Sequence, residues 1–148
     1  MIKIYNTLSK SKETFKPIQE GQVNIYVCGM TVYDLCHIGH ARVMVIFDVV
    51  RRWFDILGYS VNYVRNITDI DDKIISRSIQ NNESIQALTQ RYINEMNDDA
   101  KALGVLSPSN EPKATEHLPQ MIDIIKKLLT AGIAYEAQGH VYFDVSKA

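Results

Sequence analysis

Cysteine, histidine and glycine residues cluster in the fifteen residues between Tyr26 and His40. A thiolate at Cys28 could bind a metal ion, whereas His37 and His40 could donate hydrogen bonds to phosphate oxygens whose negative charge grows during a reaction. Gly39 would let a nucleotide approach the backbone, because glycine carries no Cβ atom. These residue types therefore favour a nucleotide site with a reactive or metal-binding thiol beside it.

The segments around this cluster predict the junction of a strand and a helix. Residues 23–27 are apolar and β-rich, which is typical of a buried parallel strand, and a helix is expected from about His40 to Leu57. Residues 60–64 predict a second parallel strand and complete a βαβ unit. Since a helix start presents unpaired N–H groups and the positive end of its dipole above the sheet, this junction suits phosphate groups.

Two other interpretations of the cysteines remain open from the residues alone. One is a self-contained zinc site of Cys28, Cys36, His37 and His40. Its spacing is poor, because seven residues separate the two cysteines and no Cys-x-x-Cys pair is present. The other is that Cys28 is a buried strand thiol that packs as a small apolar side chain.

An acidic segment follows the second predicted strand. Thr68 and Asp71 fit a capping box for a helix that runs to about Ile79. Asp69, Asp71 and Asp72 would be favourable in its first turn, near the positive end of the helix dipole. Magnesium binding by these carboxylates is the alternative, although cations in ATP sites are often held mainly by the phosphates.

Three apolar stripes at helical spacing predict buried helix faces. The stripes are Val43, Ile46, Val49, Val50, Trp53, Phe54 and Leu57; Ile85, Leu88, Tyr92, Met96, Ala100 and Leu103; and Leu118, Met121, Ile122, Ile125, Leu128 and Leu129. Thr115 is expected to cap the last helix, and Arg51 and Arg52 are expected to be solvated. Residues 2–6 predict a short strand or hairpin, residues 106–112 a loop at the internal boundary, and residues 133–145 a β-hairpin.

Composition and length are those of one globular domain. The chain has 148 residues, of which 46% are hydrophobic and 22% charged, and its formal net charge is −1. A balanced charge gives no global electrostatic case for nucleic-acid binding, so any RNA contact must be local. Without an export signal or a long apolar run we expect a chain with no membrane association, in a reducing cytoplasm that keeps Cys28 available as a ligand.

Four ordered blocks of sequence resemble the signatures of cysteinyl-tRNA synthetases, a family of class I aminoacyl-tRNA synthetases. The blocks are residues 26–42, 47–52, 63–74 and 111–117. The resemblance implies an α/β fold whose Rossmann-like parallel sheet is the first half of a class I catalytic domain, over residues 1–112. Residues 113–148 would begin a connective insertion with helices and a β-hairpin.

The resemblance also implies a two-step reaction, in which cysteine attacks ATP to give cysteinyl-adenylate and the cysteinyl group then passes to tRNA(Cys). It gives catalytic roles to His37 and His40. It places the ATP site at Met30, Thr31, Val32, Tyr33, Asp34, Leu35, Cys36, His37, Ile38, Gly39 and His40. It places the cysteine site at Cys28, Gly29, Thr31 and Thr68, with Cys28 as a zinc ligand and magnesium accompanying ATP.

The same resemblance implies that a later part of the enzyme holds the other zinc ligands, the Lys-Met-Ser-Lys-Ser loop and the main tRNA-binding region. It also implies that the full-length enzyme is a monomer. The similar residues 8–12 precede the fold's first parallel strand, so we interpret them as a solvated basic turn. The 148-residue chain alone is expected to be inactive. Two alternatives are a related ligase that passes cysteine to an amino sugar, as mycothiol ligases do, and a short, non-catalytic nucleotide-binding protein.

Overall fold

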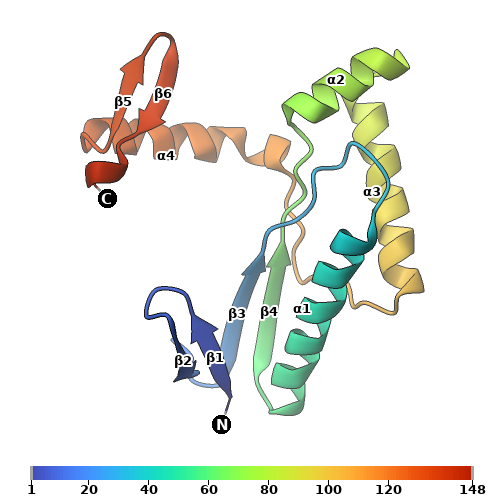
Figure 1. The fold of residues 1–148 in the computed structure, drawn as a ribbon, viewed down its shortest axis with the longest axis vertical. Coiled ribbons are helices and arrows are strands. Elements are labelled where there is room, and N and C mark those ends of the chain that lie inside the picture. Colours follow the sequence, from blue (N-terminus) through green and yellow to red (C-terminus); the bar gives the residue numbers. More distant parts are fainter. Residues whose placement is uncertain (1, 148) are drawn as a thin grey trace.

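A computed structural model describes residues 2–147, and a parallel βαβ unit organises its first half. Strands β3 (Gln22–Val27) and β4 (Ser60–Arg65) pair in parallel, with Val23 opposite Val61. Helix α1 (Ile38–Ile56) connects them and lies along one face of the pair (Figure 1). The predicted strands and helix are confirmed, although α1 begins two residues before the expected start at His40.

An antiparallel hairpin precedes this unit, as residues 2–6 predict. It consists of β1 (Lys3–Asn6) and β2 (Ser11–Thr14). Its turn is exposed, and Lys10 adopts a left-handed conformation with φ of 53°. Residues 8–12 are exposed, as predicted, but only residues 8–10 form the turn, since Ser11 and Lys12 lie in β2.

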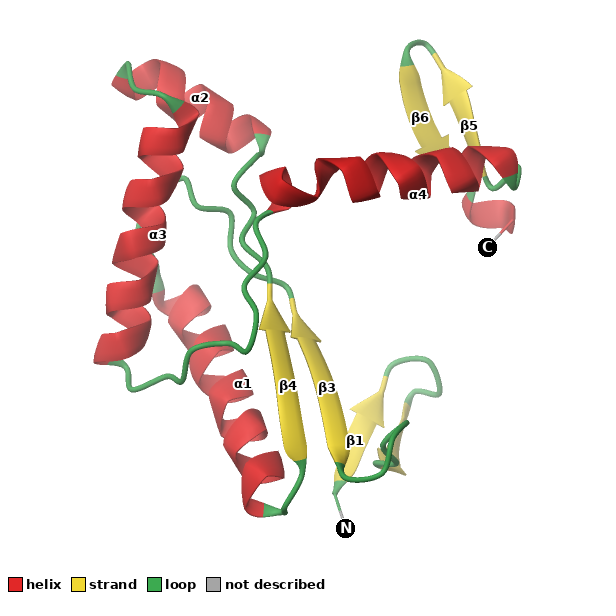
Figure 2. Ribbon diagram, turned by 180° about the vertical axis from the view of Figure 1, so that it is seen from behind, coloured by secondary structure: helices red, strands yellow, loops and turns green. Residues whose placement is uncertain are grey.

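The main core lies between α1, α2 (Asp72–Asn81), α3 (Ile85–Ala102) and the loops that follow β3 and β4 (Figure 2). It comprises Met30, Val32, Met44, Ile67, Ile74, Leu88, Tyr92, Ile93, Met96 and Ala100. The α3 stripe is thus largely confirmed, but Leu103 at its end is about half exposed. The capping box of Thr68 is wrong: the carboxylate of Asp71 caps α2 by accepting from the Lys73 N–H at 2.9 Å.

The segment after α3 is not a free loop, because residues 109–113 run alongside β4. The Arg65 N–H donates to the Asn110 carbonyl at 3.2 Å, and the Ile67 N–H donates to the Pro112 carbonyl at 2.9 Å. Arg52 is exposed, as predicted, whereas Arg51 is half-buried. Arg51 donates to the Ser107 carbonyl, and Arg52 donates to the Gly104 carbonyl at 2.8 Å, so both hold the start of this segment.

The C-terminal part extends away from the βαβ unit, on the side opposite α1 and α3 (Figures 1 and 2). It contains the short helix η1 (Ala114–His117), α4 (Leu118–Thr130), the predicted hairpin of β5 (Ala134–Ala137) and β6 (His140–Phe143), and η2 (Val145–Lys147). Thr115 does not cap α4. The N-cap is His117, which makes no side-chain cap hydrogen bond.

Two of the three predicted apolar faces are exposed. No residue of α4 is buried, and Val49 and Trp53 of α1 are more than half exposed. Of the α1 stripe only Phe54 is buried, since α1 turns Met44 and Asp48 inward instead. The prediction is wrong for these residues because, within residues 2–147, the elements in contact with α1 (β4 and α3) and with α4 (η1 and β5) leave these side chains exposed.

The fold class is α/β, as predicted, but the parallel sheet has two strands rather than a full Rossmann-like set. Residues 109–113 extend it only through the isolated bridges Val64–Asn110 and Ile67–Lys113. Within the described chain, every helix is too short or too polar to cross a membrane.

Candidate functional site

The ends of β3 and β4 meet at a glycine. A Cβ atom on Gly29 would lie 1.5 Å from the backbone oxygen of Asn66, about half the shortest separation that non-bonded atoms of these types adopt. The Gly29 N–H donates to the Asn66 side-chain Oδ1 at 2.8 Å. Only glycine lets the segments that follow β3 and β4 approach this closely at the carboxyl end of the sheet.

Asn66, which is not among the predicted site residues, joins the two strand ends. Its Oδ1 also accepts from the Tyr26 hydroxyl at 3.0 Å, and its Nδ2 donates to Thr68 Oγ1 at 3.2 Å. Because the Thr68 hydroxyl accepts this bond, its own proton is free to point elsewhere. The sequence signal that could have identified Asn66 is its position directly after a predicted strand, at the same edge of the sheet as other predicted site residues.

A hollow of about 300 Å³ opens at this end of the sheet, beside the start of α1. It is lined by Cys28, Gly29, Met30, Thr31, His40, Val43, Met44, Arg65 and Met96. Five predicted site residues, Cys28, Gly29, Met30, Thr31 and His40, are therefore brought together. Thr68 does not line the hollow; its backbone pairs with Thr31 and extends the sheet by one step.

Cys28 lies directly after β3 and is exposed. The alternative that it is a buried strand thiol is therefore wrong. Its position at the wall of the hollow leaves the sulfur accessible to a ligand or a metal ion.

Two stacked histidines form the start of α1. His37 is the N-cap, and its Nδ1 accepts from the Gly39 N–H at 3.1 Å, while His40 Nδ1 accepts from the His37 N–H at 3.2 Å. The ring centroids are 3.8 Å apart and the planes 19° apart. Since each Nδ1 is an acceptor, each neutral ring carries its proton on Nε2, where it remains available to donate to a ligand.

Acidification is expected to weaken this end of α1. Burial, with the neighbouring His37 as the second cause, lowers the pKa of His40 below its ordinary value of 6.5. The unfolded chain therefore binds more protons than the folded chain as the pH falls below about 6.5, so stability is lost there. The protection factors of the Gly39 and His40 amides, which correct for the intrinsic slowing of exchange in acid, should therefore fall between pH 7 and pH 5. An equal pH response in a His40→Asn variant would contradict this.

Cys36 is a structural thiol. It packs against the main core, and its Sγ lies 3.4 Å from Met30 Sδ. Burial, followed by the nearby carboxylate of Asp99, raises its pKa to about 11. Within residues 2–147 no three histidine, cysteine or acidic side chains are placed to hold a metal ion, so the structure gives no support to a self-contained zinc site.

The two cysteines should differ sharply toward alkylating agents. At pH 8, a thiol with a pKa of about 11 is about one thousandth thiolate, and Cys36 is half-buried as well. Iodoacetamide should therefore modify the exposed Cys28 first. Peptide mass spectrometry of a timed reaction gives both rates, and a Cys36 rate equal to that of Cys28 would refute the assignment. Cys28→Ser is the control that removes the fast phase.

The acidic segment serves the fold. Asp69 is buried, and its two carboxylate oxygens accept from the Thr115 N–H at 2.9 Å and the Thr115 hydroxyl at 2.6 Å. Asp71 caps α2, and Asp72 lies in its first turn. The magnesium alternative therefore gains no support, because Asp69 and Asp71 are already engaged and the described residues contain no metal-binding group of three.

A second buried contact joins the same two segments. Arg65 is 4% exposed, and its Nε donates to Glu111 Oε1 at 2.9 Å while its Nη2 donates to the same oxygen. Arg65 also lines the hollow. Residues 63–74 and 111–117, two of the four signature blocks, are thus held together beside the candidate site.

The eleven predicted ATP-site residues do not share one cavity. Met30, Thr31 and His40 line the hollow, Val32 is fully buried in the core, and Leu35 and Ile38 are exposed. Tyr33 and Asp34 face α2. His37, with Cys36 and Ile38, borders another hollow on the α3 side.

Comparison with known proteins identifies the family of the chain. Residues 14–148 match the family described as the tRNA synthetases class I (C) catalytic domain. The chain is 59% identical over 147 residues to the Cysteine--tRNA ligase of Ralstonia pickettii (strain 12J), and 60% identical over 145 residues to that of Janthinobacterium sp. (strain Marseille). These matches cover 99% and 97% of this chain but only 32% and 31% of those proteins, so the chain spans about a third of their length.

Among solved structures, the fold resembles a LeuRS of Agrobacterium radiobacter K84, agnB2, in a ternary complex with tRNA and LeuAMS. The TM-score is 0.66 at 22% identity, over 81% of this chain and 16% of that one. This likeness concerns the fold. The family match, which spans residues 14–148, settles the relationship: the chain belongs to the class I (C) tRNA synthetase catalytic domain family.

Proposed function

We propose that this chain is the N-terminal catalytic part of a cysteine–tRNA ligase, which activates cysteine with ATP and transfers it to tRNA(Cys). The observation that carries the proposal is the hollow at the ends of β3 and β4, where the exposed Cys28 thiol and His40 line one cavity. The relatives named Cysteine--tRNA ligase, at 59% and 60% identity, support the same substrate.

In the first step, the hollow would hold the cysteine beside the start of α1. The Nε2–H groups of His37 and His40 would donate to the phosphate oxygens of ATP, whose charge increases as pyrophosphate leaves. The N-terminal end of the α1 dipole acts in the same direction. The Thr68 hydroxyl accepts from Asn66, so its own proton would remain available to the substrate.

Cys28 fits the role of one zinc ligand, because its sulfur is exposed and lines the hollow. A bound zinc ion would coordinate the thiolate of the substrate, a bond that the hydroxyl of serine imitates poorly. The other protein ligands, a cysteine, a histidine and a glutamate, would come from a later part of the enzyme. Magnesium would enter with ATP.

The division of the chain follows from the same proposal. Residues 1–112 would form the first half of the Rossmann-like catalytic domain, and residues 113–148 would begin the connective insertion. The exposed apolar faces of α1 and α4 support a longer protein in which further residues cover them. We propose that the full-length enzyme is a monomer in the cytoplasm, and that residues 1–148 alone are inactive.

Exchange of pyrophosphate into ATP by the full-length enzyme tests the proposal. Exchange should depend on cysteine and should fall at least 100-fold in Cys28→Ala and in His40→Ala, since each removes a group that binds the reactants. His140→Ala, which removes an exposed histidine from β6, is the matched control and should retain wild-type exchange. Unchanged pyrophosphate exchange in both Cys28→Ala and His40→Ala would refute the roles assigned to these residues. Transfer of the cysteinyl group to an amino sugar instead of tRNA would refute tRNA(Cys) as the acceptor.

A further inference from the structure

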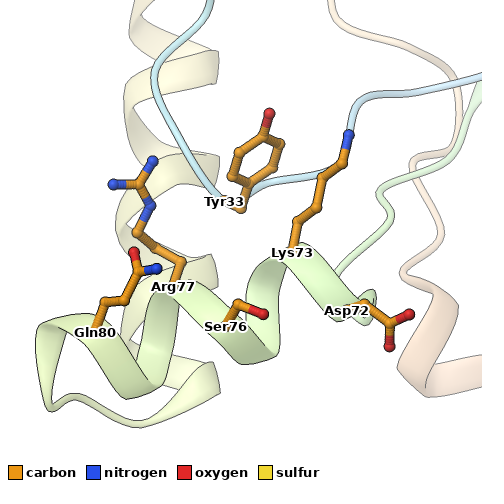
Figure 3. A pocket seen from close by; sticks show the side chains of 6 residues that line it. All are labelled: Tyr33, Asp72, Lys73, Ser76, Arg77 and Gln80. Carbon is orange, nitrogen blue, oxygen red and sulfur yellow. The ribbon is translucent and has the colours of Figure 1, made fainter.

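A second hollow of about 300 Å³ lies between α2 and the signature loop, which we define as residues 30–36. It is lined by Tyr33, Asp72, Lys73, Ser76, Arg77 and Gln80 (Figure 3). No residue of this set lines the hollow at the ends of β3 and β4. The signature loop therefore borders this hollow through Tyr33 and the hollow at the strand ends through Met30 and Thr31.

The side chains of the second hollow combine an aromatic ring with cations and neutral hydrogen-bonding groups. The Lys73 ammonium lies 5.5 Å from the centroid of the Tyr33 ring, and the Arg77 Nη2 lies 2.7 Å from Asp34 Oδ2. Figure 3 shows Tyr33, Lys73 and Arg77 extending to the same side of α2, while the carboxylate of Asp72 points away from them. Rings and cations in this combination are typical of sites for single-stranded nucleic acid.

The local charge distinguishes this hollow from another that borders the loop. The hollow lined by Cys36 and His37 contains the carboxylate of Asp99 and otherwise mostly apolar side chains. A phosphodiester would be repelled there. Beside α2, the Asp34 carboxylate is already paired with Arg77, whereas Lys73 is exposed and has Tyr33 as its neighbour.

We infer that the hollow between α2 and the signature loop binds the single-stranded 3′ end of the RNA substrate, with Lys73 contacting a phosphodiester and Tyr33 stacking on a base. The inference rests on the proposed function, because the terminal ribose must reach the cysteinyl group in the first hollow. The nucleotides that precede the terminal ribose would then lie across the signature loop, where this second hollow opens. The chain is close to electrically neutral overall, so a contact of this kind must be local.

Kinetics of the full-length enzyme with Lys73→Gln test the inference and separate RNA phosphate from ATP phosphate. The KM for tRNA should rise about tenfold, and the salt dependence of tRNA binding should fall by about one phosphate contact. The KM for ATP in pyrophosphate exchange should stay unchanged. Lys73→Arg should restore most tRNA affinity, and Lys12→Gln, an exposed lysine on β2 far from α2 in Figure 1, is the matched control.

Two results would overturn the inference: an unchanged KM for tRNA, or a raised KM for ATP with tRNA unaffected, which would make Lys73 a support for the loop. A wild-type enzyme without cysteine-dependent exchange would instead refute the proposed function. In that case, fluorescence anisotropy with a labelled single-stranded RNA ending in CCA still tests the hollow. Wild type should then bind about tenfold more tightly than Lys73→Gln, and equal binding would overturn the inference.

Discussion

Replacing Gly29 with alanine is expected to lower the rate of cysteine activation about 100-fold. The added Cβ would lie 1.5 Å from the Asn66 backbone oxygen, so the ends of β3 and β4 must separate by more than an ångström. That separation breaks the Gly29–Asn66 hydrogen bond and displaces Cys28 from the wall of the hollow. Misplacement of a reacting group by about 1 Å costs about 100-fold in rate. Pyrophosphate exchange at saturating ATP and cysteine measures the effect.

The matched control is Gly132→Asn. Gly132 lies at the turn after α4 with φ of 69°, has open space around it, and asparagine tolerates this conformation. Its exchange rate should equal that of the wild type. Circular dichroism of both variants separates a local displacement from global unfolding. A folded Gly29→Ala enzyme with the wild-type rate would show that the strand ends do not position the reactants.

Replacing Glu111 with alanine is expected to destabilise the contact between β4 and residues 109–113 by about 3–5 kcal/mol. Arg65 is 4% exposed, so loss of its partner leaves a buried guanidinium without a counter-charge. Hydrogen exchange at the Arg65 and Ile67 amides reports this directly, because both donate to carbonyls of that segment. Their protection factors should fall at least 100-fold if local opening governs exchange.

Glu83→Ala provides the comparison. Glu83 pairs with Arg91 at 2.6 Å, but the Arg91 side chain is 46% exposed, and such pairs contribute at most about 1 kcal/mol. Protection in α3 should change little in this variant. If Glu111→Ala left the Arg65 and Ile67 amides as protected as in the wild type, the buried ion pair would not hold the two segments together.

Local pattern was sufficient to predict the elements that position the site. The apolar run at residues 23–27, the helix that follows His37 and the second strand at residues 60–64 were all identified. Parallel strands bring their carboxyl ends to one edge, so Cys28, Gly29, Thr31 and His40 could be expected to gather there. The structure places these four around one hollow.

The contacts that complete the site join residues more than thirty positions apart and leave no periodic signal. Asn66 reaches back to Gly29 and Tyr26, and Asp69 reaches forward to Thr115. Thr115 matches a local helix-capping pattern and Asp69 a favourable first-turn position, but in the structure the two side chains bond to each other instead. The predicted burial of the apolar face of α1 was wrong for a different reason. Periodicity identifies a helix face that needs a packing partner, but it does not show whether residues 2–147 contain that partner.

X-ray absorption at the zinc edge of the full-length protein, with and without cysteine, tests most directly whether the hollow at the ends of β3 and β4 recognises the substrate thiol. We expect the zinc sulfur shell to gain one sulfur when cysteine is added and none when serine is added. In the Cys28→Ala variant the protein should contribute one sulfur fewer to the zinc sulfur shell. A sulfur shell that neither cysteine nor the loss of Cys28 alters would contradict the account.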